Sequence, residues 1–131
     1  MSFIDIEVGD AVELEPVDSG EYKVQVDDAE VGTSAKTGGD YILLRLSIPD
    51  EPLSKGLTHV MMLPTPDDDE KQQNNRKLSI KSACEALGVS HERGINVEEF
   101  IGKQGWAHLG VEESEEYGIQ NRLRRWTVSS G

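Results

Sequence analysis

A chain of 131 residues, 36% of them hydrophobic and 29% charged, is long enough to bury one core without disulfide bonds, so we expect a single domain. No run of about twenty apolar residues occurs and the N-terminus is acidic, so we expect neither a membrane span nor a secretory signal. The formal net charge of −12 argues at first against a nucleic-acid partner, because a negative surface repels phosphate.

The negative charge is concentrated at the start of the chain. Residues 1–30 hold ten acidic residues and one basic residue, a net of −9, whereas the other 101 residues hold fifteen acids and twelve bases, a net of −3. The later part is nearly balanced and can therefore present a local basic surface. Within the acidic part, residues 1–19 alternate apolar and acidic residues, which favours either an acidic arm or an added edge strand before a domain over residues 20–131.

Alternating apolar and polar residues predict three strands in the first half of the chain, at residues 20–31, 40–49 and 56–63. Asp27 and Asp28 interrupt the first alternation and indicate a bulge or a strand end.

The strand at residues 40–49 has the strongest pattern of the three. Its core face is formed by four aliphatic residues, Ile42, Leu44, Leu46 and Ile48. Tyr41 and Arg45 then lie on the opposite face, where a ring and a guanidinium group suit base stacking and phosphate pairing. The small-residue loop before this strand carries Lys36 at its tip, either free to reach a phosphate or simply solvated.

Acidic residues 67–70 precede a predicted helix over residues 70–87, and we expect them to cap it. Consecutive aspartates splay apart, so we expect no Mg²⁺ site there. Gly88 is a typical end for the helix, and a short helical turn follows at residues 97–101. One stripe recurs at helical spacing and packs on the sheet, with Cys84 as a buried, reduced thiol: Ile80, Ala83, Cys84 and Leu87.

Residues 103–126 hold both tryptophans. Their pattern predicts two strands joined by an acidic turn, and the second strand runs from residue 119 to residue 128. On the first strand, Trp106 and His108 alternate with an aliphatic row. On the second strand, strict alternation places three residues on one side, Arg122, Arg124 and Trp126, and Arg125 on the other. Flat rings beside guanidinium groups suit stacked bases and phosphates. The alternative is that the tryptophans belong to the core and the arginines are solvated edge charges.

The predicted order is three strands, a helix and two strands. A five-stranded barrel with its helix between the third and fourth strands is the oligonucleotide-binding (OB) arrangement. We therefore expect a mainly β fold, an OB-type barrel with that one α-helix and a short helical turn. The histidines His59, His91 and His108 have no metal-ligand spacing to one another or to Cys84, and no nucleophile motif occurs, so we expect no catalysis, metal or cofactor.

Five short motifs, in order, carry a likeness to a known family. They are Gly-x-Tyr at 20–22, Gly-Gly-x-Tyr at 38–41, Ala-Leu-Gly at 86–88, Ile-Gly-Lys at 101–103 and Asn-Arg-x-Arg-Arg-Trp at 121–126. In these motifs the chain, over about residues 20–127, resembles the phage-encoded single-stranded DNA-binding proteins of OB type. The resemblance implies sequence-independent binding of single-stranded DNA in phage DNA replication, recombination or repair. It also implies the cytoplasm of the infected bacterial host as the location, and phage or host replication and recombination proteins as further partners.

The expected DNA contacts are rings that stack on bases and cations that hold phosphates. The set is Lys36, Tyr41, Arg45, Trp106, His108, Tyr117, Arg122, Arg124, Arg125 and Trp126. The alternative from another class is a non-catalytic protein-interaction barrel, a phage accessory factor whose acidic surface binds a basic protein. A third alternative is a nuclease or recombination cofactor that uses the acids with Mg²⁺. The oligomeric state is left open by the sequence.

Overall fold

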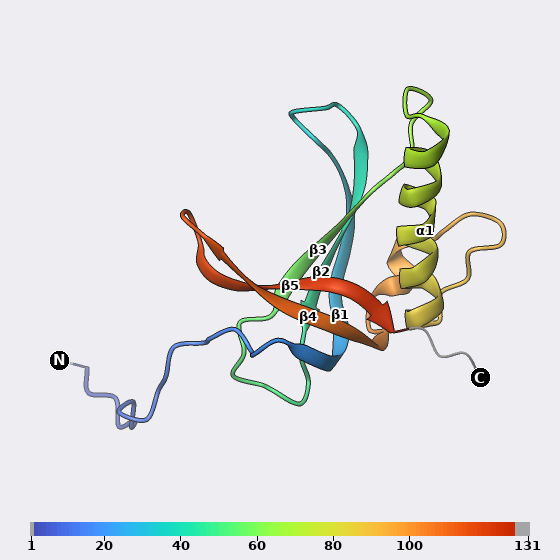
Figure 1. Cartoon of the computed structure of the whole chain (residues 1–131). Coiled ribbons are helices and arrows are strands. Elements are labelled where there is room, and N and C mark those ends of the chain that lie inside the picture. The colour runs from blue at the N-terminus through green and yellow to red at the C-terminus, as the bar shows by residue number, and fades with distance from the viewer. Residues whose placement is uncertain (1, 128–131) are drawn as a thin grey trace.

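The computed structural model describes residues 2–127 and shows five antiparallel strands in one open sheet and one α-helix (Figure 1). The elements are β1 (Gly20–Thr33), β2 (Asp40–Ser47), β3 (Leu57–Met62), α1 (Glu70–Leu87), the 3-10 turn η1 (Val97–Phe100), β4 (Gln104–Ser114) and β5 (Gly118–Thr127). The mainly β class and the helix between the third and fourth strands are confirmed. The predicted end of the last strand at Val128 lies outside the described residues.

The long strand β1 organises the sheet, whose strand order is β3-β2-β1-β4-β5. The first part of β1, up to Gln25, pairs with β4, and the part from Gln25 onward pairs with β2. The register shifts between Val26 and Asp28, which confirms the bulge predicted at the aspartate pair. A bulge bends its strand and increases the local twist. As a result, the β1–β2 and β4–β5 hairpins project from the sheet in different directions (Figure 1).

The two end strands, β3 and β5, lie near each other although no strand pairing joins them in the described chain. The ring of His59 on β3 meets the ring of Trp126 on β5 edge to face, with centroids 5.9 Å apart and planes at 78°. A cavity of about 310 Å³ lies between the strands, lined by residues 56–60 on one side and mainly by residues 120–123 on the other. The sheet is therefore strongly curved, but it is open.

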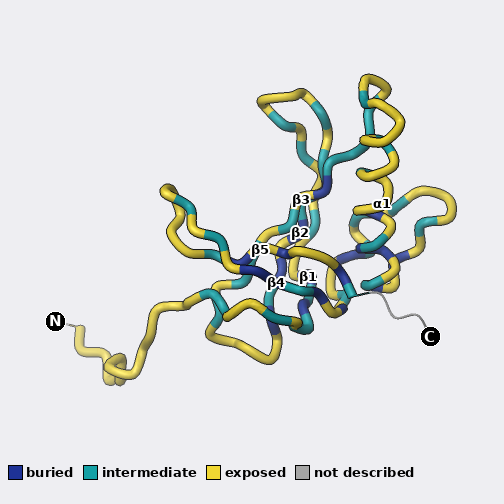
Figure 2. The backbone as a smooth tube through the Cα atoms, viewed as in Figure 1, coloured by how far each residue is buried: buried dark blue, intermediate teal, exposed yellow. Residues whose placement is uncertain are grey.

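The core lies on the inner side of this curve, where the predicted apolar rows meet. Ile42, Leu44 and Leu46 of β2 are buried, as are Val24 and Val26 of β1 (Figure 2). The predicted stripe of α1 packs against them, and Cys84 in that stripe is buried and free. Burial raises the pKa of the Cys84 thiol, and the nearby Glu99 and Glu85 raise it further. These core predictions are confirmed.

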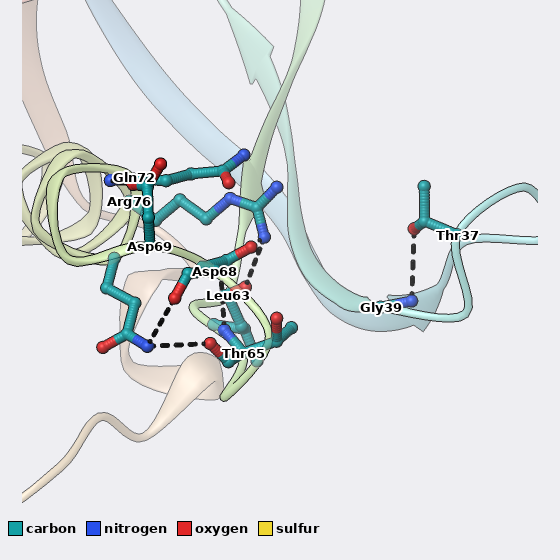
Figure 3. A network of polar contacts seen from close by, with 9 residues as sticks. Thr37, Gly39, Leu63, Thr65, Asp68, Asp69, Gln72 and Arg76 are labelled. Carbon is teal, nitrogen blue, oxygen red and sulfur yellow. Dashed lines mark hydrogen bonds and ion pairs between the residues drawn. The ribbon is translucent and has the colours of Figure 1, made fainter.

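Both ends of α1 agree with the sequence. Asp69 caps the start, since its carboxylate accepts a hydrogen bond of 2.7 Å from the backbone N–H of Gln72. The preceding Asp68 accepts a 2.9 Å bond from Arg76, which anchors the first turns to the entering loop (Figure 3). Gly88 ends the helix in the left-handed conformation, with φ 73°. No helix within residues 2–127 is long and apolar enough to cross a membrane.

Residues 2–14, which we call the N-terminal arm, form no strand and extend away from the sheet (Figure 1). The arm is exposed throughout, including its apolar residues (Figure 2). Just afterwards, Glu15 forms an isolated bridge with Ser54 in the loop between β2 and β3. The buried Asn121 then holds Val17, because its amide oxygen accepts from the Val17 N–H at 2.8 Å and its amide nitrogen donates to the Val17 carbonyl at 2.8 Å. Residues 2–14 therefore contain no strand.

Candidate nucleic-acid interface

Trp106 stands on the outer side of β4 and is 45% exposed. Its cross-strand partner on β1 is Lys23. The Nζ atom of Lys23 lies 5.8 Å from the centroid of the indole ring, within the range of a cation–π contact. The next outward residue of β4, His108, lies between Glu21 of β1, at 3.0 Å, and Arg125 of β5, at 3.4 Å. We call this surface the Trp106 face; it comprises Lys23, Trp106, His108, Arg122, Arg124 and Arg125.

A bulge in β5 decides which of its residues belong to the Trp106 face. His108 pairs with Arg125 and Leu109 pairs with Leu123, so Arg124 is the extra residue. Arg124 and Arg125 are therefore both exposed.

Trp126 lies on the inner side, only 8% exposed, paired with Ala107. The prediction that Trp126 shares an outer side with Arg122 and Arg124 is wrong, because strict alternation fails at the bulge. We therefore leave Trp126 out of the candidate DNA contacts. Arg125, which strict alternation placed on the side opposite Arg122 and Arg124, lies on the outer side with them.

The cations of the Trp106 face differ in how far they are neutralised. Arg122 donates to Glu112 at 2.9 Å, so part of its charge is already compensated. Within residues 2–127, Lys23, Arg124 and Arg125 form no ion pair with a carboxylate. Arg124 lies over Gly110, where a side chain would collide with its guanidinium group. The face therefore combines one exposed ring with three uncompensated cations.

Tyr41 and Arg45 lie on a different surface, the outer side of β2, which we call the Tyr41 face. The ring of Tyr41 lies against Gly32, its partner on β1. Arg45 is held by two carboxylates, Asp28 at 3.8 Å and Glu30 at 3.3 Å. A guanidinium group already paired with two acids is a poor binder of phosphate. The two faces adjoin different halves of β1, so the predicted contacts do not form one continuous surface.

Lys36 and Tyr117 lie at the tips of the two hairpins, Lys36 in the β1–β2 loop and Tyr117 in the β4–β5 turn. Both are exposed, Tyr117 by 65%. Within the described chain, no hydrogen bond or ion pair links either side chain to the two faces. Their assignment as DNA contacts stays a prediction.

Lys23 is the residue of the Trp106 face that the sequence analysis missed. Its signal was present, because Lys23 alternates with the apolar row of Tyr22, Val24 and Val26 and so had to point outward. What the sequence lacked was the register between β1 and β4, which brings Lys23 opposite Trp106. Among the described residues, no group of three or more His, Cys, Asp or Glu side chains is placed to hold a metal ion.

Comparison with known proteins gives one family. A family model described as a protein of unknown function (DUF669) matches residues 4–119. A search of curated proteins found no match. The matched segment includes Lys23 and Trp106 and ends before Arg122, so part of the Trp106 face lies within it.

Proposed function

The chain belongs to the DUF669 family of proteins of unknown function, and we propose that it binds single-stranded DNA without sequence preference. In this proposal it is a non-catalytic protein of phage DNA replication, recombination or repair. The observation that carries the proposal is the Trp106 face, where an exposed indole ring lies among three uncompensated cations. Rings and cations together are what sequence-tolerant single-strand binding requires, because every base can stack and every nucleotide carries a phosphate.

We also infer that the curved sheet is an OB-type barrel left open between β3 and β5. The strand order, the helix between β3 and β4 and the contact of His59 with Trp126 support this assignment. In OB folds, oligonucleotides bind on the β2–β3 face and its flanking loops, which here correspond to the Tyr41 face and the two hairpin tips. Charge favours the Trp106 face instead, because Arg45 on the Tyr41 face is compensated by acids.

A base that stacks on the side of the Trp106 ring where Lys23 lies displaces the Lys23 ammonium group. An exposed cation–π contact is worth about 0.5–1 kcal/mol. Stacking of a base on an aromatic ring is worth about 1–3 kcal/mol, and the released ammonium group can then pair with a phosphate. The exchange therefore favours the bound strand despite the loss of the internal contact.

Titration with oligo-dT tests the proposal. Trp106→Ala should weaken binding about ten-fold or more, whereas Tyr41→Ala, a matched loss of a ring on the other face, should have a smaller effect. Three phosphate contacts predict that log affinity falls with log salt at a slope of about −2, and Lys23→Gln should reduce its magnitude by about 0.7. Absence of binding, or a slope near zero, would overturn the proposal. The opposite order of the two alanine variants would move the site to the Tyr41 face.

A protein-interaction function is the second candidate, and the N-terminal arm favours it. Phe3 and Ile4 of the arm are 85% and 75% exposed and are followed by acids. An acidic segment with exposed apolar side chains suits a basic partner with an apolar groove. This function predicts capture of a basic protein by the intact chain, loss of that capture when residues 2–14 are deleted, and no effect of oligo-dT on tryptophan emission.

A further inference from the structure

A second cavity, of about 330 Å³, lies between α1 and the loop that joins the helix to η1. We call it the α1 groove. Three aliphatic residues line it, Leu78 and Ile80 of α1 and Ile95 of the loop. Ile80 is buried, but Leu78 is 53% exposed, so the groove presents apolar surface to the solvent.

The titratable residues that line the α1 groove are basic. They are His91 and two lysines one helical turn apart, Lys77 and Lys81, and no Asp or Glu lines the groove among the described residues. Within residues 2–127, Lys77 forms no ion pair, and Lys81 meets only Glu85, at 3.8 Å between exposed side chains. An exposed pair of this kind neutralises little charge. The groove therefore suits an apolar segment that also carries negative charge.

The N-terminal arm of this same chain has that composition. In an extended segment, Ile4, Ile6 and Val8 lie on one side, and Asp5 and Glu7 lie on the other. The three aliphatic residues are 75%, 67% and 66% exposed. Monomeric proteins rarely expose several neighbouring large apolar side chains unless the segment has a partner surface. The arm therefore matches the α1 groove both in its apolar side and in the sign of its charge.

We propose that the α1 groove binds the N-terminal arm of a second copy of this chain. The aliphatic side of the arm packs against Leu78, and Asp5 and Glu7 pair with Lys77 and Lys81. The arm comes from a second copy because the chain's own arm leaves the sheet at the end of the molecule opposite α1 (Figure 1). Arm and groove are different surfaces, so the contact is head to tail and leaves a free arm and a free groove at the two ends of each assembly.

Two complementary full-length variants test this contact by sedimentation equilibrium. The arm variant carries Ile4→Ser and Ile6→Ser, and the groove variant carries Lys77→Glu and Lys81→Glu; all four residues are exposed, so both variants should fold. The average mass of the wild type should rise with concentration, whereas each variant alone should stay monomeric. An equal mixture should form a dimer and nothing larger, because it contains one intact kind of arm and one intact kind of groove. A monomeric wild type, a monomeric mixture or growth beyond the dimer in the mixture would overturn the proposal.

An exchange of charges separates this pairing from an effect of net charge. The groove variant should lose about ten-fold or more in self-association, and adding Asp5→Lys and Glu7→Lys to the same chain should restore it. Lys36→Glu with Lys55→Glu makes the same change in net charge at exposed lysines outside the groove and should leave the association near that of the wild type. Equal losses in the two lysine variants, or no recovery after the exchange, would contradict the pairing. No DNA is present, so the result is independent of the proposed strand binding.

Discussion

His59 is a residue whose ionisation the fold controls. It lies on the inner side of β3 against Trp126. Burial and, second to it, the positive charge of Arg122 together lower the pKa of its imidazole from 6.5 to about 4. The side chain is therefore neutral in the native protein at neutral pH, whereas the unfolded chain takes up a proton on this residue below about pH 6.5.

The free energy of unfolding should consequently depend on pH through His59. The contribution of neutral His59 is fully present above pH 6.5 and is lost as the pH falls from 6.5 to about 4, by at most about 3 kcal/mol. Urea unfolding at several pH values should show this loss in the wild type and in His91→Gln. His59→Phe, which cannot be protonated, should show a shallower decline, and identical slopes for wild type and His59→Phe would contradict the assignment.

Trp126 and Arg45 show why the site was harder to predict than the core at the level of single residues. The burial of Leu44 or Val24 follows from alternation, because the pattern on each side of the strand is unbroken. The side on which Trp126 lies depends on one extra residue, Arg124, and no sequence pattern marks that bulge. The two acids that neutralise Arg45 come from another strand, so their effect depends on a register that the sequence does not give.

The helix α1 was predicted with its bounds because its signals are local. The cap at Asp69 and the end at Gly88 each depend on residues within one turn. The pairing of β1 with β4 joins residues 79 to 89 positions apart, 83 for Lys23 and Trp106, and required the structure. Elements that depend on local signals were therefore predicted correctly, whereas the division of the predicted DNA contacts between two faces depends on long-range pairing and was not.

The cap of α1 provides a test at the scale of this element. Asp69→Ala removes the acceptor for the Gln72 N–H and should lower the free energy of unfolding by about 0.5–2 kcal/mol. Asp67→Ala removes a carboxylate of equal charge from the same acidic run but no hydrogen bond in the described structure, and should change stability by less than about 0.5 kcal/mol. Chemical denaturation measures both, and equal losses would show that the acidic run acts through its charge alone.

For the whole molecule, the uneven charge is the dominant property. The N-terminal arm carries four acids and no base, so deletion of residues 2–14 changes the net charge from −12 to −8. An acidic arm repels the phosphates of an approaching strand or competes with them for basic side chains.

Deletion of the arm should therefore raise the affinity for oligo-dT several-fold at low salt, with the difference vanishing at high salt as the charges are screened. A full-length chain in which Phe3, Ile4 and Ile6 are replaced by Ser keeps the arm's charge and should bind like the wild type. If the deletion variant binds no more tightly than the wild type at low salt, the arm exerts no electrostatic control over the Trp106 face.

Photocrosslinking locates a bound strand on this molecule most directly. Oligo-dT carrying 5-iodouracil is bound to the wild-type chain, irradiated, and the crosslinked peptides are identified by mass spectrometry. A base stacked on Trp106 predicts crosslinks at that residue, on the peptide that contains β4, and their loss in Trp106→Ala. Crosslinks confined to Tyr41, or none under conditions in which the oligonucleotide is bound, would contradict the assignment of single-strand binding to the Trp106 face.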